Sequence, residues 1–148
     1  MPETTSTGDT LQATGGCLCG DVRYRVTGRL RPVIYCHCSQ CRRTSGHFVA
    51  ATAVPKNALA IVTDESLEWF ASSQSASRGF CRRCGSSLFW RSRERDYVAV
   101  MAGTLDEAPG LTAVEHIHVG DKGDYYELTD DLPKSLASRR SGAWNSAG

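Results

Sequence analysis

The stretch Cys81-Arg82-Arg83-Cys84-Gly85 decides how this chain folds, because its two thiols are separated by two residues. That spacing lets both sulfurs face one metal ion at about 2.3 Å, as in a zinc knuckle. Gly85 permits the sharp turn that a larger side chain would strain. A second glycine-flanked pair occurs much earlier, in Gly16-Cys17-Leu18-Cys19-Gly20. Together the pairs supply four thiolates, enough to close a tetrahedral zinc shell and to offset the entropic cost of closing so long a loop.

Three further thiols lie between these pairs, in Cys36-His37-Cys38-Ser39-Gln40-Cys41. Three ligands from one short segment cap a metal from one side and leave the other side open. Structural zinc sites are closed, whereas catalytic sites keep an open position. The pattern therefore favours a structural zinc on Cys17, Cys19, Cys81 and Cys84 and a catalytic zinc on Cys36, Cys38 and Cys41.

Other ligand sets fit the same spacing. The middle cysteines could form a second closed site with His37 or His47, or the chain could bind a single zinc and keep free thiols. Because His37 alternates with two cysteines, we expect it to point away from the metal. Disulfides are disfavoured, since seven cysteines are an odd number and a reducing compartment keeps thiols free.

The composition predicts one loop-rich domain. The chain has 148 residues, of which 41% are hydrophobic and 14 are glycine. No apolar run approaches the roughly 20 residues that cross a bilayer, and Met1–Thr14 is too polar for a signal peptide, so we expect a cytoplasmic protein with no membrane partner. The net charge of +1 provides no basic surface, which makes nucleic acid an unlikely partner.

The order of segments predicts a mainly β fold of short antiparallel strands. We expect a disordered lead over 1–13, a single zinc domain over 14–135 and a disordered tail over 136–148. A short helix is predicted over Ser39–Ser45, with Ser39 as its N-cap and Gly46 at its end. Strands are predicted over 22–26, 47–54, 60–63, 67–71, 87–91, 97–102 and 114–119.

The ordered motifs resemble one known family. Gly15-Gly16-Cys17-Leu18-Cys19-Gly20, then Cys36-His37-Cys38-Ser39-Gln40-Cys41, then Phe80-Cys81 through Cys84-Gly85-Ser86 are similar to the glutathione-dependent formaldehyde-activating enzymes, a family that includes the centromere protein V-like proteins. The resemblance runs from about Gly15 to Pro133. It implies an Mss4-like zinc-binding β fold, a structural zinc on Cys17, Cys19, Cys81 and Cys84, and a catalytic zinc on Cys36, Cys38 and Cys41.

The resemblance also implies a carbon–sulfur lyase activity on a thiol–aldehyde adduct such as S-hydroxymethylglutathione. The partners would be a small thiol such as glutathione and a small aldehyde such as formaldehyde. Arg42 and Arg43 follow the last cysteine and could pair with the substrate's carboxylates, and His47 is a further substrate candidate. The alternative is a zinc-stabilised binding or scaffold module without catalysis.

Overall fold

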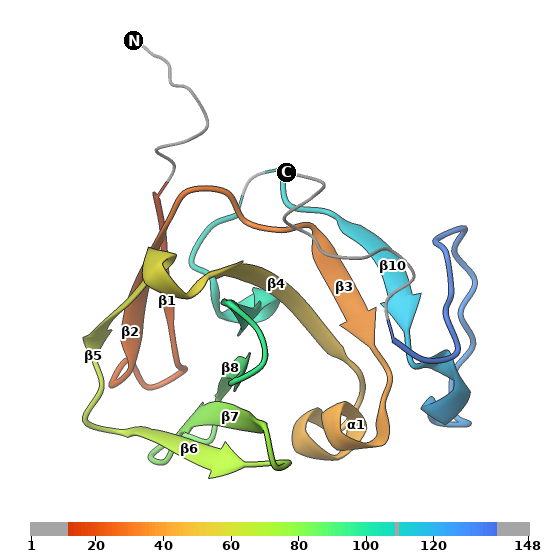
Figure 1. The fold of residues 1–148 in the computed structure, drawn as a ribbon, viewed down its shortest axis with the longest axis horizontal. Coiled ribbons are helices and arrows are strands. Elements are labelled where there is room, and N and C mark those ends of the chain that lie inside the picture. Colours follow the sequence, from red (N-terminus) through yellow and green to blue (C-terminus); the bar gives the residue numbers. More distant parts are fainter. Residues whose placement is uncertain (1–11, 109, 139–148) are drawn as a thin grey trace, which may run out of the picture.

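The computed structural model describes residues 12–108 and 110–138. Over these residues the fold is mainly β, with ten strands and one α-helix, which confirms the predicted fold class. The strands form two sheets (Figure 1). The predicted lead over 1–13 and tail over 136–148 lie for the most part outside the described residues, although Gln12 and Ala13 are already part of the first strand.

The smaller sheet is antiparallel and has three strands in the order β1-β2-β5. Its strands are β1 (Gln12–Gly16), β2 (Arg23–Thr27) and β5 (Leu59–Thr63). Along β2 the side chains of Tyr24 and Val26 are buried and that of Arg25 is exposed, as expected when alternate side chains point to opposite faces. One face of this sheet therefore packs on the rest of the protein.

The larger sheet has seven strands in the order β10-β3-β4-β9-β8-β7-β6. Its strands are β3 (Val33–Cys36), β4 (Val49–Pro55), β6 (Leu67–Ala71), β7 (Ala76–Cys81), β8 (Ser87–Ser92), β9 (Tyr97–Met101) and β10 (Ala113–Ile117). Five of its strand pairs are antiparallel, but β10 pairs with β3 in parallel. The expected antiparallel pairing therefore holds for five pairs, and the β10–β3 pair is an exception, because a long connection returns β10 to the sheet in the same direction as β3.

Two hydrophobic clusters lie on opposite faces of the larger sheet. Val98 and Val100 of β9 belong to the cluster that also contains Tyr24, Cys17 and Cys81. Ala99, between them, belongs to the cluster that contains Cys41. Because consecutive strand residues point to opposite faces, β9 separates the two sets of cysteines.

Aromatic packing fixes the two sheets against each other. The rings of Tyr24 and Phe89 meet edge to face, with centroids 5.1 Å apart, and the Trp69 ring stacks on Phe89 with centroids 5.9 Å apart. Burying a side chain of this size stabilises the fold by about 1.5–3 kcal/mol. Trp69 and Phe89 come from the larger sheet and Tyr24 from the smaller one, so this core joins both sheets.

The helix α1 (Ser39–Ser45) has the predicted bounds, and Gly46 ends it in the left-handed conformation with φ of 84°. Its N-cap is Cys38 rather than Ser39, because the Cys38 sulfur accepts the N–H of Cys41. In Figure 1, α1 lies at the end of the larger sheet where β3 ends and β4 begins. Three 3-10 turns complete the described elements: η2 (Lys56–Ala58), η3 (Ala102–Thr104) and η4 (Val119–Asp121).

The predicted strands all occur, with ends shifted by up to two residues. The sequence reading missed β1, β3 and β7. It also extended β10 too far, since the chain leaves the strand at His118, which adopts a left-handed conformation with φ of 55°. None of the helices in the described ranges is long and apolar enough to cross a membrane.

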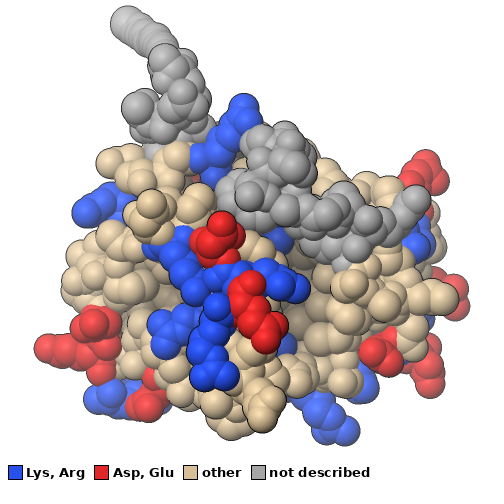
Figure 2. Space-filling model, in the orientation of Figure 1, with Lys and Arg blue, Asp and Glu red and all other residues tan. Residues whose placement is uncertain are grey.

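Figure 2 shows basic and acidic side chains intermixed near the centre of one face of the molecule. The signs alternate in sequence along the exposed Arg93-Glu94-Arg95-Asp96 segment that follows β8. The field above such a surface is weak, because opposite charges close together largely cancel.

Candidate metal centres

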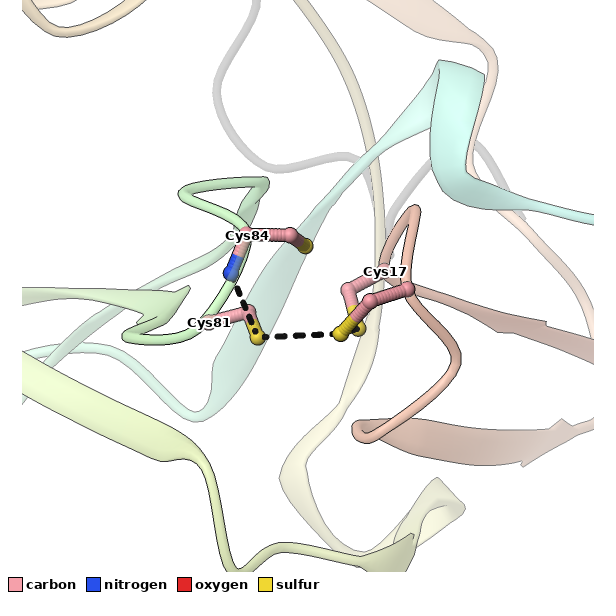
Figure 3. A group of neighbouring side chains, drawn as sticks. Cys17, Cys81 and Cys84 are labelled. Atoms are coloured by element: carbon pink, nitrogen blue, oxygen red, sulfur yellow. Dashed lines mark hydrogen bonds between the residues drawn. The ribbon is translucent and has the colours of Figure 1, made fainter.

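Four cysteines, here called the four-cysteine group, come together from two places in the fold. Cys17 and Cys19 lie in the turn between β1 and β2, whereas Cys81 is the last residue of β7 and Cys84 lies in the turn that follows it. Figure 3 shows Cys17, Cys81 and Cys84 pointing toward one another from these two places. All four sulfurs lie within 4.8 Å of one another; the Cys17–Cys19 distance is 3.6 Å and the Cys19–Cys81 distance is 3.8 Å. Four bonds of 2.3 Å in a tetrahedron require sulfurs about 3.8 Å apart, so the group fits one zinc ion.

Backbone N–H groups and glycines shape both turns of this group. The N–H of Val22 lies 3.2 Å from the Cys17 sulfur, and that of Cys84 lies 3.4 Å from the Cys81 sulfur. Gly20 and Gly85 adopt positive φ values of 88° and 83°, which confirms the sharp turn expected at Gly85. Hydrogen bonds to sulfur favour the thiolate form, which is the form that binds metal.

Three cysteines, here called the three-cysteine group, form the second centre. Cys36 is the last residue of β3, Cys38 caps α1 and Cys41 lies within that helix. Their sulfurs also lie within 4.8 Å of one another, and among the described residues this group contains no fourth ligand atom. Cys36 and Cys38 are half-buried and Cys41 is buried. Three sulfurs at this spacing could hold a metal ion and leave one position for another ligand.

Charge repulsion within the three-cysteine group indicates that it suits a cation. Hydrogen bonds from the Cys36 and Cys41 side chains hold the pKa of Cys38 far below its ordinary value. Hydrogen bonds with Cys38 and Cys41, together with burial, raise the pKa of Cys36 far above its ordinary value. Without a cation the group therefore ionises one thiol at the expense of its neighbour, whereas a metal ion allows all three to be thiolates.

Arg78 of β7 contacts the three-cysteine group and was missed by the sequence reading. Its Nη1 lies 3.8 Å from the Cys41 sulfur, and its Nη2 donates to Oε1 of Gln40 at 3.2 Å. Arg78 also lines a hollow of about 310 Å³ beside α1, together with Thr44, Phe70 and Phe80. No sequence signal pointed to it, because β7 itself was not predicted and nothing local ties Arg78 to cysteines on another strand and a helix.

The predicted substrate residues take different positions. Arg42 is half-buried, and its Nε is buried without a hydrogen-bond partner. Arg43 is exposed. His47 is exposed and forms a hydrogen bond through Nδ1 with the Tyr125 hydroxyl. Both arginines follow Cys41 on α1, whereas His47 lies just beyond the helix.

His37 points away from the sulfurs of the three-cysteine group, as the alternation around it predicts. Its Nδ1 lies 2.5 Å from the Tyr126 hydroxyl, and its Nε2 lies 2.8 Å from Nδ1 of His116. Burial, together with the neighbouring His116, lowers the pKa of His37 to about 4. Both ring nitrogens already have partners within the protein, so His37 is not available as a fourth ligand.

A second hollow lies away from both cysteine groups. A groove of about 560 Å³ is lined by Lys56, Trp69, Arg91 and Arg93 among others, and none of its lining residues is a cysteine. The Arg91 guanidinium lies 3.7 Å from the centroid of the Trp69 ring. The hollow beside Arg78 is smaller but adjoins the helix that carries Cys41, which makes it the better candidate for a substrate.

The fold and its sites define a class of protein: a mainly β domain with two separate cysteine groups, one of four thiols and one of three. The chain belongs to the family of glutathione-dependent formaldehyde-activating enzymes, whose family model matches residues 12–121.

Two curated proteins are similar in sequence to this chain. An uncharacterized lyase of Schizosaccharomyces pombe is 25% identical over 118 residues, covering 78% of this chain and 85% of the relative. A candidate glutathione-dependent formaldehyde-activating enzyme of Halomonas elongata is 29% identical over 124 residues, covering 77% of this chain and 79% of the relative. The crystal structure of a Rhodobacter sphaeroides protein has a TM-score of 0.54 and 27% identity, covering 66% of this chain and 91% of that one.

Proposed function

We propose that this protein is a zinc-dependent carbon–sulfur lyase that joins a small thiol to a small aldehyde, or splits the adduct, in a reducing compartment such as the cytoplasm. The observation that carries the proposal is the three-cysteine group, which fits a metal with one position left free. Zinc there would offer that position to the substrate sulfur and would favour its thiolate form near neutral pH.

The four-cysteine group would hold the second, structural zinc. Cys17 and Cys81 belong to the hydrophobic cluster that both sheets share, so a metal on this group would tie the smaller sheet to the larger one. The three-cysteine group packs on the opposite face of β9. This separation supports one zinc that stabilises the fold and one that takes part in the reaction.

The basic residues around the three-cysteine group support a thiol substrate that carries carboxylates, such as glutathione. Arg78 contacts Cys41 and lines the adjoining hollow, and Arg42 and Arg43 follow Cys41 on α1. Guanidinium groups bind carboxylates through paired hydrogen bonds. We infer that Arg78 and Arg42 orient the peptide part of the substrate, with Arg43 and His47 at its exposed edge.

Exchange between glutathione, formaldehyde and S-hydroxymethylglutathione, followed by NMR with the zinc-loaded protein, tests this function. We expect the protein to accelerate the exchange, and Cys38→Ser to abolish the acceleration while the chain remains folded. If neither glutathione nor any other small thiol reacts faster in its presence, the binding or scaffold module is the better account. Equal loss of folding in Cys38→Ser and Cys84→Ser would favour that module as well.

A further inference from the structure

The groove of about 560 Å³ that Trp69 and Arg91 line takes no part in the proposed reaction. Val98, which also lines it, belongs to one hydrophobic cluster, whereas the neighbouring Ala99 belongs to the cluster that contains Cys41. Because consecutive strand residues point to opposite faces, the groove opens on the face away from the three-cysteine group. Its volume is typical of small-molecule sites, so it can hold a ligand of its own.

The strand register gathers the residues of this groove. Arg91 of β8 pairs with Ser77 of β7 on one side and with Val98 of β9 on the other. All three line the groove, so they form one row on the same face of the larger sheet. Leu59 and Ile61 of β5 add apolar side chains from the smaller sheet. The groove therefore combines apolar surface with polar and charged groups.

The guanidinium of Arg91 is supported on one face and keeps its donors unused. Its central carbon lies 3.7 Å from the centroid of the Trp69 ring, so the flat face of the cation rests on the indole. The N–H groups of a guanidinium point outward in its own plane. Within the described part of the chain, none of those of Arg91 donates a hydrogen bond. The edge of this cation is therefore available to a ligand.

Two further cations at the groove, Lys56 and Arg93, are held by groups that do not neutralise them. Nζ of Lys56 donates to the carbonyl of Ser92 at 3.0 Å, and Nη2 of Arg93 donates to the carbonyl of Gln74 at 2.5 Å. Among the described residues, no carboxylate forms an ion pair with Lys56, Arg91 or Arg93. Three positive charges therefore line one groove without a counterion.

The nearby acidic residues do not offset these charges inside the groove. Glu94 and Asp96 alternate with basic residues in the segment after β8, but neither lines the groove. Glu68 of β6 forms an ion pair with Arg82, at 3.8 Å. Like charges that share a site repel, and a bound anion relieves the repulsion.

We propose that this groove binds a small organic molecule that carries two negative charges, on a phosphate group or on paired carboxylates, and an apolar body. Lys56, Arg91 and Arg93 bind the charged oxygens, and a guanidinium edge can contact two oxygens at once. The hydroxyls of Ser75 and Ser77 line the same groove and add donors. The apolar side chains of β5 contact the body of the ligand. This site does not depend on the lyase function.

Phenyl phosphate and phthalate test the proposal, because each joins two negative charges to an apolar ring. Titration into 15N-labelled, zinc-loaded protein is followed by 1H–15N NMR of the Trp69 indole N–H and the Arg91 Nε–H. We expect both signals to shift saturably with at least one of the two compounds, with a dissociation constant of about 1 mM or below. The Trp90 indole is the internal control, because Trp90 packs in the cluster with Cys41 on the other face.

Inorganic phosphate and phenol separate the two parts of the ligand. Each should bind at least about 10-fold more weakly than phenyl phosphate, since one lacks the apolar contact and the other lacks the charge. If inorganic phosphate binds as tightly as phenyl phosphate, the apolar lining contributes nothing. If phenol does so, the cations contribute nothing. Either result overturns the proposed ligand class.

Substitutions locate the binding site. Arg91→Met should raise the dissociation constant at least about 10-fold, because it removes charged hydrogen bonds and keeps much of the side-chain volume. Lys56→Met, a change at an exposed position, should weaken binding as well and repeats the test if Arg91→Met disturbs folding. Arg95→Met is the matched control, because Arg95 is exposed in the segment after β8 but does not line the groove.

Three results would overturn the proposal. The first is a spectrum that neither phenyl phosphate nor phthalate changes. The second is equal weakening by Arg95→Met and Arg91→Met, which would show attraction to net charge alone. The third is a set of shifts confined to α1, which would place the anion beside the three-cysteine group.

Discussion

Ala99 and Val100 are neighbours on β9 and pack against different cysteine groups. Val100 lies in the cluster with Cys17 and Cys81, and Ala99 in the cluster with Cys41. The central strand of the larger sheet therefore keeps the two candidate metal centres on opposite faces. Changes at one centre should leave the other largely intact.

Serine substitutions in the two groups should therefore have different effects. Cys84→Ser should prevent stable folding, because a structural zinc contributes on the order of 10 kcal/mol to folding. Cys38→Ser should remain folded and lose one zinc per chain. Thermal unfolding followed by circular dichroism, combined with zinc analysis, makes the comparison. Two equally unfolded variants would contradict separate roles for the groups.

Arg78 should strengthen metal binding at the three-cysteine group, because its charge favours the thiolate form of Cys41. Arg78→Met keeps much of the side-chain volume and removes the charge. We expect it to weaken zinc binding at this group about 10-fold, as is usual when a group that contacts a metal ligand is lost. Competition with a chromophoric chelator measures the change.

Arg25→Met is the control for that experiment, because Arg25 is exposed on β2 in the other sheet. It should bind zinc as the natural protein does. If Arg78→Met binds zinc as tightly as the natural protein does, the 3.8 Å contact between Arg78 and the Cys41 sulfur has no effect on zinc affinity.

The cysteine groups could be found from the sequence because each pair or trio is local, and spacing alone brings its sulfurs to one side. Arg78 could not, because it contacts Cys41 from a strand far along the sequence from Cys36–Cys41. Its position depends on how β7 pairs with its neighbours in the larger sheet.

There are also physical reasons why the sequence did not predict strands β3 and β7. β3 reads Val33-Ile34-Tyr35-Cys36, a continuous apolar run without alternation. β7 carries Ala76, Ser77 and Gly79, which have little strand propensity of their own, and is held by pairing on both edges to β6 and β8. The bulky Trp69 and Phe89 rings explain the glycine, since a Cβ at Gly79 would lie 3.0–3.2 Å from them.

The lowered pKa of Asp130 leads us to expect that the free energy of unfolding depends on pH. Its folded pKa of about 2, lowered by the hydrogen bond with His116, lies below the ordinary value of 3.8, so the carboxylate stabilises the fold fully above about pH 4. That contribution is lost as the pH falls from 4 through 2. Asp130→Asn should be less stable than the natural protein at pH 7, by an amount that stays constant down to about pH 4 and shrinks below it.

Denaturant titrations of both proteins between pH 7 and pH 2 measure this difference, and any release of metal in acid affects both alike. Asp124→Asn is the control, because Asp124 is an exposed carboxylate in the same segment. A stability difference that persists unchanged to pH 2 would show that the charge of Asp130 does not support the fold.

The central claim is that the three-cysteine group holds a metal with room for a substrate sulfur. Titrating glutathione into the cobalt-substituted protein tests it most directly, because each added thiolate ligand strengthens the sulfur-to-cobalt charge-transfer absorption. We predict a saturable increase complete at about one glutathione per chain, and no increase in Cys38→Ser. An absorption spectrum that glutathione and other small thiols leave unchanged, with both metal sites filled, would contradict the claim.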